Sequence, residues 1–253
     1  MSKRALLLSL GVLATCLLAG LWWWRSLSEP LPRGEPGPAA EALAARMMKA
    51  AHVEAWERLA AVRFRFRNQR NHLWDRRRGL AEVRWGEDRV LLRLADRTGL
   101  AFHAGLPLSG LEGRSYVRKA YRAWRNDAYW LNPLARFYDP GAQRERVHLP
   151  DQSEALLVRY GEPAPNAGDA YLWLPGDDGL PVEARVWVGT IPVGGSRASW
   201  EGWTTLPGGA KVATRHRLAH VSIGIDNIEG AATLQQLVGP DDPFAPLLTQ
   251  SDR

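Results

Sequence analysis

The side chains that could carry out acid–base or metal chemistry are few and far apart in the sequence. Asp127 and Asp139 could act as a general acid and a general base only if folding brought them together. His216 and His220 lie four residues apart in a predicted strand region, which places them about 13 Å apart along one face, too far to share a metal ion. We therefore expect helix-end or turn roles for the aspartates and ordinary surface or hydrogen-bonded roles for the histidines.

Motifs of common catalytic folds are absent from the sequence. It contains no GxxxxGK[ST] phosphate loop, no GxGxxG and no HExxH. The segment Gly194-Gly195-Ser196-Arg197-Ala198 comes near to GxSxG, but alanine replaces the last glycine and no strand-to-helix turn is predicted around it, so we interpret it as a flexible loop. A single cysteine, Cys16, excludes an intrachain disulfide and a zinc site built from several thiolates. We expect no catalytic residue, no metal site and no cofactor.

The aromatic residues are the most informative part of the composition. The chain of 253 residues has 12 tryptophans, and most of them lie in the part predicted to fold. Large rings on a curved sheet either fill a core or line an apolar cavity between the sheet and a helix. Both interpretations stay open from the composition alone.

The N-terminus has the properties of a membrane segment. The stretch Ala5–Trp24 has no charged residue, and a helix of that length spans roughly 30 Å, the thickness of a bilayer core. Lys3 and Arg4 precede it, and Trp22–Trp24 lie where an aromatic belt forms. We expect residues 1–25 to be a single-pass anchor in a bacterial inner membrane, with the remaining chain in the periplasm.

Two other interpretations of this segment stay open. It could be a cleaved signal peptide. Leu13-Ala14-Thr15-Cys16 also approximates a lipobox, in which Cys16 would be lipidated, although Thr15 is larger than the usual residue and the apolar run continues after the cysteine. Residues 26–38 are rich in proline and glycine and are predicted to form a semi-rigid linker.

The net charge gives little information about partners. The chain has 33 Lys and Arg against 27 Asp and Glu, a formal net charge of +6. Without Lys3, Arg4 and Arg25, 30 basic residues face 27 acidic ones, a net charge of +3. Only four of the basic residues are lysines, which indicates a compositional preference for arginine. We do not expect nucleic acid as a partner.

The pattern beyond the linker predicts a β-rich domain with two helices. Residues 39–61 favour an amphipathic helix, and the strict alternation in Val62–Arg67 is typical of a strand. Apolar positions from Val117 to Leu131 recur at helical spacing, with Arg118, Lys119, Arg122 and Arg125 on the opposite side. Further strands are predicted at residues 80–85, 90–94, 100–103, 155–160, 170–174, 182–188, 199–204, 211–219 and 220–228.

These elements predict an α+β fold. The connections between strands are too short for crossover helices, so nine or ten strands should pair antiparallel. One curved sheet packed against helices accounts for the helical face better than a β-sandwich does. We expect this domain to cover residues 39–240, followed by a flexible tail at 241–253.

Several segments resemble a known superfamily. Asn126-Asp127-Ala128-Tyr129-Trp130-Leu131-Asn132-Pro133, followed by Asp139-Pro140-Gly141, looks like a group of exported bacterial proteins similar to the LolA/LolB-type lipoprotein carriers. The resemblance covers roughly residues 40–230, and weaker matches continue it in the expected order at residues 55–66, 73–75, 171–174 and 200–203.

The resemblance implies a half-open antiparallel β-barrel with helices across its concave face as a lid. In the carriers, an apolar cavity there accepts the acyl chains of lipoproteins, which needs no catalytic residue. The expected function is therefore a membrane-anchored, periplasm-facing protein that binds a lipid or a lipidated partner. The expected groove residues are Trp124, Tyr129 and Trp130 on the lid and Trp173 and Trp187 on the sheet.

Two alternatives of other classes stay open. The chain could be an envelope scaffold or interaction protein whose aromatic residues fill a core. It could also be a hydrolase that uses Asp127, Asp139 or His216. The scaffold requires a filled concave face, and the hydrolase requires these side chains to converge in one cleft.

Overall fold

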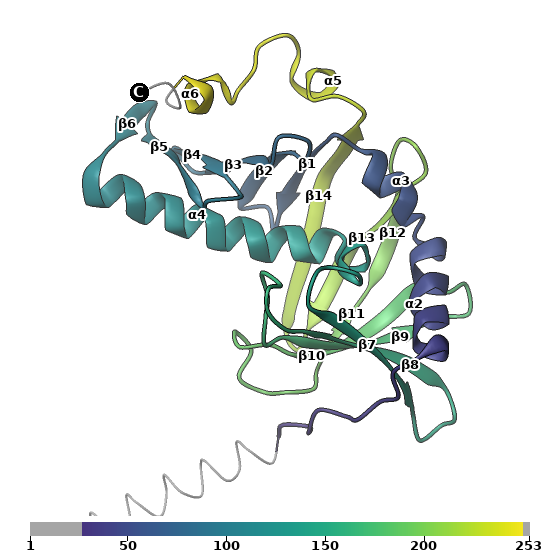
Figure 1. Ribbon diagram of the computed structural model, residues 1–253. Coiled ribbons are helices and arrows are strands. Elements are labelled where there is room, and N and C mark those ends of the chain that lie inside the picture. The colour runs from purple at the N-terminus through teal and green to yellow at the C-terminus, as the bar shows by residue number, and fades with distance from the viewer. Residues whose placement is uncertain (1–26, 250–253) are drawn as a thin grey trace, which may run out of the picture.

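A computed structural model describes residues 27–249, and within them one long antiparallel sheet curves round a concave face (Figure 1). The strand order is β6-β5-β4-β3-β2-β1-β14-β13-β11-β10-β9-β8-β7, with β12 paired to β13 beside this path, and the sheet does not close. The strands are β1 Ala61–Phe66, β2 Arg70–Asp75, β3 Leu80–Trp85, β4 Asp88–Arg93, β5 Thr98–His103, β6 Leu106–Leu108, β7 Ala142–His148, β8 Glu154–Tyr160, β9 Ala170–Pro175, β10 Pro181–Trp187, β11 Ser196–Ser199, β12 Glu201–Thr205, β13 Lys211–Leu218 and β14 Val221–Ala231.

The prediction of a curved antiparallel sheet with helices is confirmed, but the described residues contain more strands than predicted. Short turns join β1 to β5 in sequence, and β14 returns to pair with β1, with Val62 opposite Gly230. The missed strands include β2 and β7, whose sequences RNHLWD and AQRERVH carry several polar side chains. Their pairing depends on neighbouring strands more than on intrinsic strand preference, which explains why the sequence pattern did not reveal them.

The helices are α2 Pro38–Ala50, α3 Val53–Arg58, α4 Gly110–Leu131, the 3-10 helix η1 Pro133–Arg136, α5 Gln235–Val238 and α6 Ala245–Leu248. The single helix predicted at residues 39–61 is two helices. His52 adopts a left-handed conformation with φ of 51°, which interrupts the helix, and β1 has already begun at Ala61. The central helix is confirmed and ends at Leu131, just before Pro133.

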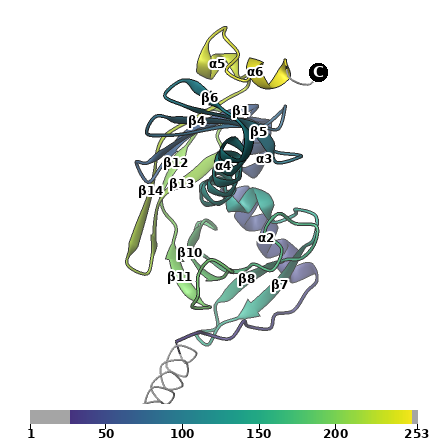
Figure 2. The same ribbon diagram turned by 90° about the vertical axis from the view of Figure 1, so that its left-hand side faces the viewer.

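Helices α2 and α4 cover the same, concave face of the sheet (Figures 1 and 2). At one end, Val117 and Ala120 of α4 pack on the inward side chains of β3, β4 and β5. At the other end, Leu43 and Met47 of α2 belong to the core cluster of Leu156 and its neighbours on β8 to β10. The last turns of α4 reach the middle of the arc, where both halves of the sheet meet.

The two ends of the described chain cover the convex face. The segment from Leu27 to Glu35 crosses the second half of the sheet, where Leu31 packs against the outward side chains of β8 and β9. Residues 232–249, here called the C-terminal strap, cross the first half and bury Phe244 and Leu247 against Leu73 and Leu91. Each half of the sheet is therefore covered on both faces.

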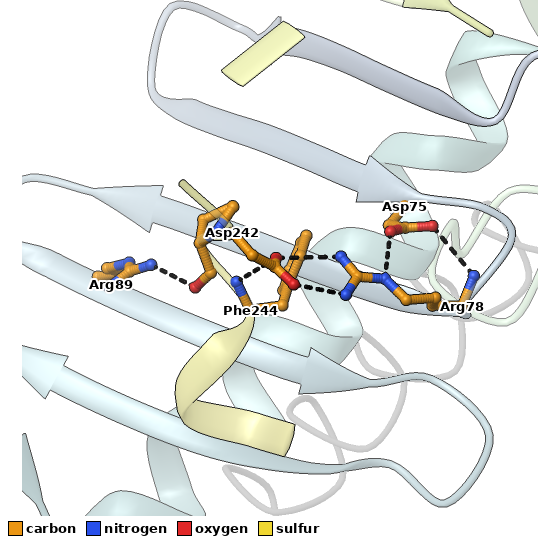
Figure 3. A network of polar contacts seen from close by, with 6 residues as sticks. Asp75, Arg78, Arg89, Asp242 and Phe244 are labelled. Atoms are coloured by element: carbon orange, nitrogen blue, oxygen red, sulfur yellow. Dashed lines mark hydrogen bonds and ion pairs between the residues drawn. The ribbon is translucent and has the colours of Figure 1, made fainter. Parts of the chain in front are cut away.

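Charged side chains fasten the C-terminal strap to the sheet (Figure 3). The guanidinium of Arg78 donates to both carboxylate oxygens of Asp242, at 2.6 and 3.0 Å, and to Asp75 at 2.6 Å. The same guanidinium lies 5.6 Å from the ring centroid of Phe244. Arg89 donates to the Pro243 carbonyl at 2.8 Å.

The termini differ from the sequence-based expectations within the described residues. The predicted flexible tail is wrong for residues 241–249, because Phe244 is 0% exposed and Leu247 2%. The predicted linker is packed on the domain from Leu27 onward, with a bridge between Glu35 and Arg146. The predicted membrane segment lies outside the described residues, and no helix between residues 27 and 249 is long and apolar enough to span a membrane.

Candidate functional site

The last turns of α4 occupy the centre of the concave face, and their sequence places different residue types on each side. Val117, Ala120 and Ala128 recur at helical spacing and are buried against the sheet. Beyond the helix, the Asn132 side chain accepts a hydrogen bond from the Ala135 amide at 3.4 Å and begins η1. Pro133 follows, which ends α4 at a fixed point above the sheet.

A buried carboxylate fixes α4 to β2. The two oxygens of Asp127 accept hydrogen bonds from Arg70 at 2.7 and 2.9 Å, and Nε2 of His72 lies 2.8 Å from Oδ2. Asn126 donates to the same carboxylate at 3.0 Å. The side chains of Asp127 and His72 are both 0% exposed. This arrangement sets how far the second half of α4 stands from the sheet.

Electrostatics keep this cluster in one protonation state near neutral pH. Burial lowers the pKa of His72, so its ring is neutral and Nε2–H donates to Asp127. Burial alone raises the pKa of Asp127, but the hydrogen bonds from His72 and Arg70 outweigh it and leave the pKa below its ordinary value. The carboxylate is thus charged, completely surrounded and structural.

The remaining candidate catalytic groups are not brought together. Asp139 pairs with Arg136 at 2.8 Å, three residues away, in the turn role expected from the sequence. His216 lies in β13, where its Nδ1 is 3.2 Å from the Ser199 carbonyl, and burial lowers its pKa to about 4. His220 lies in the turn between β13 and β14. Within residues 27–249 no group of three or more His, Cys, Asp or Glu is arranged to hold a metal ion.

The Gly194–Ala198 segment is more ordered than the predicted flexible loop. Ser196 begins β11, which pairs with β10, and the Gly194 carbonyl accepts from the Glu29 amide at 2.9 Å. The Ser196 hydroxyl donates to the Val193 carbonyl at 2.6 Å. A serine engaged in this way is part of a turn.

A cleft of about 310 Å³ opens between α4 and the second half of the sheet; we call it the tyrosine cleft. Tyr129 and Trp130 of α4 form one side. Tyr171 of β9 and Trp200 form the floor, with Trp130 stacked on Trp200 at 5.1 Å between ring centroids and 14° between planes. The apolar lining is completed by Val186, Val188 and Ile191.

Polar groups surround this apolar floor. Arg122, Arg125 and Arg136 line the tyrosine cleft, and Arg125 donates only to the Pro165 carbonyl, at 3.1 Å. Burial raises the pKa of Asp169, the one acidic side chain lining the cleft. The Asn166 side-chain amide and the Trp200 indole nitrogen are buried without a hydrogen-bond partner in the described chain. The cleft therefore combines an apolar floor with basic groups.

A second cleft, of about 530 Å³, lies on the other side of α4; we call it the tryptophan cleft. Trp74 and Trp124 meet edge to face there at 5.4 Å, and Trp56 lies 6.3 Å from Trp74. Arg76 lies over Trp56 at 4.9 Å and also donates to the Leu59 carbonyl at 3.0 Å. Arg125, Arg136 and Pro165 line both clefts, so the two adjoin.

No protein-family model matches the chain, and a search of curated proteins returns no relative. Two solved structures resemble it. A DUF1329 family protein from Desulfovibrio piger aligns with a TM-score of 0.42 and 11% identity over 83% of this chain and 97% of its own. An outer membrane lipoprotein-sorting protein domain from Vibrio parahaemolyticus aligns with a TM-score of 0.30 and 8% identity over 74% of this chain and 93% of its own.

The structure separates the five residues expected to share a groove. Tyr129 and Trp130 line the tyrosine cleft, and Trp124 lines the tryptophan cleft. Trp173 is 0% exposed beneath Trp200, at 4.8 Å between centroids, and is core. Trp187 was expected on the concave face and is not there: its side chain packs with the convex cluster and donates to the Glu29 carbonyl at 2.8 Å.

Several cleft residues were not found from the sequence. Tyr171 lies two residues before Trp173 and therefore on the same face of β9. Once the face that carries Trp173 is known, strand alternation predicts Tyr171 as a cleft residue. Arg122 and Arg125 lie on the side of α4 that the helical period marks as polar. Asn166 and Arg136 have no such signal, because they come from a loop and a 3-10 turn positioned only by tertiary packing.

Proposed function

We propose that this protein binds a lipid or a lipidated partner in the tyrosine cleft and does no chemistry on it. The observation that carries the proposal is the composition of the cleft: Trp200 in the floor and Trp130 stacked on it form an apolar surface, and Arg122, Arg125 and Arg136 line the cleft around it. An amphipathic molecule satisfies both parts at once, since its apolar chain covers the rings and its anionic head pairs with guanidinium groups.

The size of the cleft supports this choice. A volume of about 310 Å³ lies at the lower end of the range of small-molecule sites. The adjoining tryptophan cleft offers room for a longer chain. Burying an acyl chain contributes about 0.8 kcal/mol per CH₂, so an apolar cleft binds without covalent chemistry.

The proposal includes the location expected from the sequence. An N-terminal anchor at residues 1–25, or a lipid on Cys16, would hold the domain at the periplasmic side of the inner membrane. A tethered domain suits presentation or sensing of a lipid at that membrane better than transport across the periplasm.

The test is photocrosslinking of the full chain with a diazirine fatty acid, followed by peptide mass mapping. We expect label on peptides that contain Trp130, Trp200 and residues 186–191. Trp130→Ala should reduce this labelling several-fold, because it removes the ring stacked on Trp200. Trp187→Ala is the matched control, since Trp187 is also partly buried but lies on the convex face.

Two results would contradict the proposal. One is labelling spread evenly over the surface, and the other is an equal loss of labelling in Trp130→Ala and Trp187→Ala. Either result favours the alternative of an envelope scaffold, for which the complete burial of Trp173 and Phe137 in the core is the supporting observation.

A further inference from the structure

One side of α4 carries a row of arginines that form no ion pair with other described residues. Arg114, Arg118 and Arg122 recur every four residues, are exposed, and have no hydrogen-bond or ion-pair partner among residues 27–249. Arg125 continues the row and donates only to a backbone carbonyl. We call these four residues the arginine row; it covers about 17 Å of helix at 1.5 Å per residue.

The arginine row is distinguished by its regular spacing along one helix. Other exposed arginines without an ion-pair partner among residues 27–249, such as Arg46, Arg58 and Arg77, lie on separate elements. Arg63, by contrast, pairs with Glu229 at 2.7 Å. Like charges four residues apart destabilise a helix, so the unpaired row weakens α4 in isolation. An external anion would remove this repulsion.

Exposed apolar side chains lie at the same end of the helix. Leu111, in the first turn of α4, is 80% exposed, and Leu106, in the adjoining strand β6, is 71% exposed. These are the two most exposed of the large apolar side chains in the described chain. In Figure 1 this end of α4 and β6 project together from the body of the molecule, away from α2 and α3.

Arginines and exposed leucines at one projecting end suit a bilayer surface. Each basic side chain near an anionic membrane strengthens binding, and leucine side chains enter the boundary between head groups and acyl chains. A nucleic acid or an acidic protein segment would satisfy the arginines but would leave both leucines in water. We propose that this end of α4 docks on anionic phospholipids, with the arginine row on phosphates and Leu106 and Leu111 in the interface.

Docking in this manner has a consequence for the tyrosine cleft. Arg122 and Arg125 belong both to the row and to the cleft lining, so contact with lipid head groups would bring the cleft mouth to the membrane. The docking itself depends only on the surface of α4 and β6. It can therefore hold even if the cleft binds no lipid.

The experiment places a reporter beside the leucines in the full chain. Cys16→Ser removes the single cysteine, and Ser109→Cys introduces a labelling position between Leu106 and Leu111; the Ser109 side chain makes no capping hydrogen bond. The chain, labelled with a polarity-sensitive fluorophore, is reconstituted in nanodiscs of phosphatidylcholine alone or with about a third phosphatidylglycerol. We expect a blue shift, and quenching by lipid-borne quenchers, only with phosphatidylglycerol.

Charge reversal tests the arginine row itself. R114E/R118E/R122E should lower the ratio of docked to undocked protein on the order of 100-fold and abolish the quenching. R46E/R58E/R77E is the matched control, because it changes the net charge equally at exposed arginines on α2, α3 and the β2–β3 turn. If R114Q/R118Q/R122Q has an unchanged melting temperature, any loss of docking that it shows does not come from misfolding.

Three outcomes would overturn the proposal. Equal quenching in both lipid compositions would show that anionic head groups are not recognised. An equal loss in the control triple variant would show an effect of overall charge. A reporter that responds to a DNA oligonucleotide but not to phosphatidylglycerol would identify a polyanion site instead of a membrane surface.

Discussion

Oδ2 of Asp127 on α4 lies 2.8 Å from Nε2 of His72 on β2, and neither side chain is exposed to solvent. The pair joins the helix that borders both clefts to the strand beneath it. His72 is itself stacked on Phe64, at 4.6 Å between ring centroids, so the contact continues into the core. A carboxylate that would suit acid–base chemistry by residue type thus serves to position α4.

Asp127→Ala should destabilise the protein strongly. It leaves Arg70 without its charged partner and His72 with no acceptor in a buried position, a change that costs about 3–5 kcal/mol. The melting temperature of the full chain should fall by roughly 10 °C. Asp177→Ala is the control, because Asp177 is exposed in the β9–β10 turn and should change the melting temperature little. A small and equal effect of both substitutions would contradict the structural role.

Stability should decrease as the pH falls from about 6.5 to 4. The folded-state pKa of His216 is lowered to about 4 from an ordinary 6.5, because the ring is buried. Between these values the unfolded chain binds a proton at this position that the folded chain does not, so acid favours unfolding, by on the order of 3 kcal/mol. The lowered pKa of His72 acts in the same direction.

The variant His216→Phe isolates this effect. Phenylalanine keeps a ring in contact with both Trp130 and Trp200, whose centroids lie 5.2 and 4.5 Å from that of His216, but it does not titrate. Melting temperatures measured at neutral pH and near pH 4.5 should differ less for the variant than for the natural chain. The same pH dependence in both proteins would mean that folding does not lower the pKa of His216.

Replacing each of two neighbouring leucines in the C-terminal strap should change the free energy of unfolding by very different amounts. Leu247 is 2% exposed and packed on the convex face, whereas Leu248 is 43% exposed. Leu247→Ala should cost about 2–5 kcal/mol, and Leu248→Ala should stay within about 0.5 kcal/mol. Thermal unfolding of the two variants measures the difference. Equal melting temperatures would show that residues 245–249 do not pack on the sheet in solution.

Two strand glycines provide a test of the backbone packing. A Cβ at Gly99 on β5 would stand 2.0 Å from the Leu91 carbonyl oxygen, and backbone cannot move aside easily. A Cβ at Gly224 on β14 would meet nothing within 4 Å. Gly99→Ala should therefore cost about 1–3 kcal/mol and Gly224→Ala close to nothing, as measured by melting temperature. The reverse order would place β4 and β5 in a different register.

The sequence by itself determined the local structure well where the periodicity is strong. The alternation from Val62 to Phe66 predicts β1, and the helical spacing from Val117 to Leu131 predicts α4. The short connections predict antiparallel pairing. In each case the side-chain period determines the type of element, and the short connections allow only antiparallel pairing.

The position of Trp187 was decided by the tertiary structure. Strand alternation places it on the opposite face from Val186. Only the packing of Glu29 and Leu31 against Trp187 shows that this face of β10 is the convex one. The packing of the C-terminal strap has the same cause: Phe244 and Leu247 are buried because the convex face of β1 to β5 is apolar.

The roles of Asp127 and of the arginine row also required the fold. A carboxylate next to an aromatic segment has the same sequence signature whether it catalyses or positions, and the difference comes from Arg70 and His72, more than 50 residues earlier. The spacing of Arg114, Arg118 and Arg122 was visible in the sequence. Within residues 27–249 no acidic side chain pairs with them, which is a property of the surrounding surface that only the assembled chain defines.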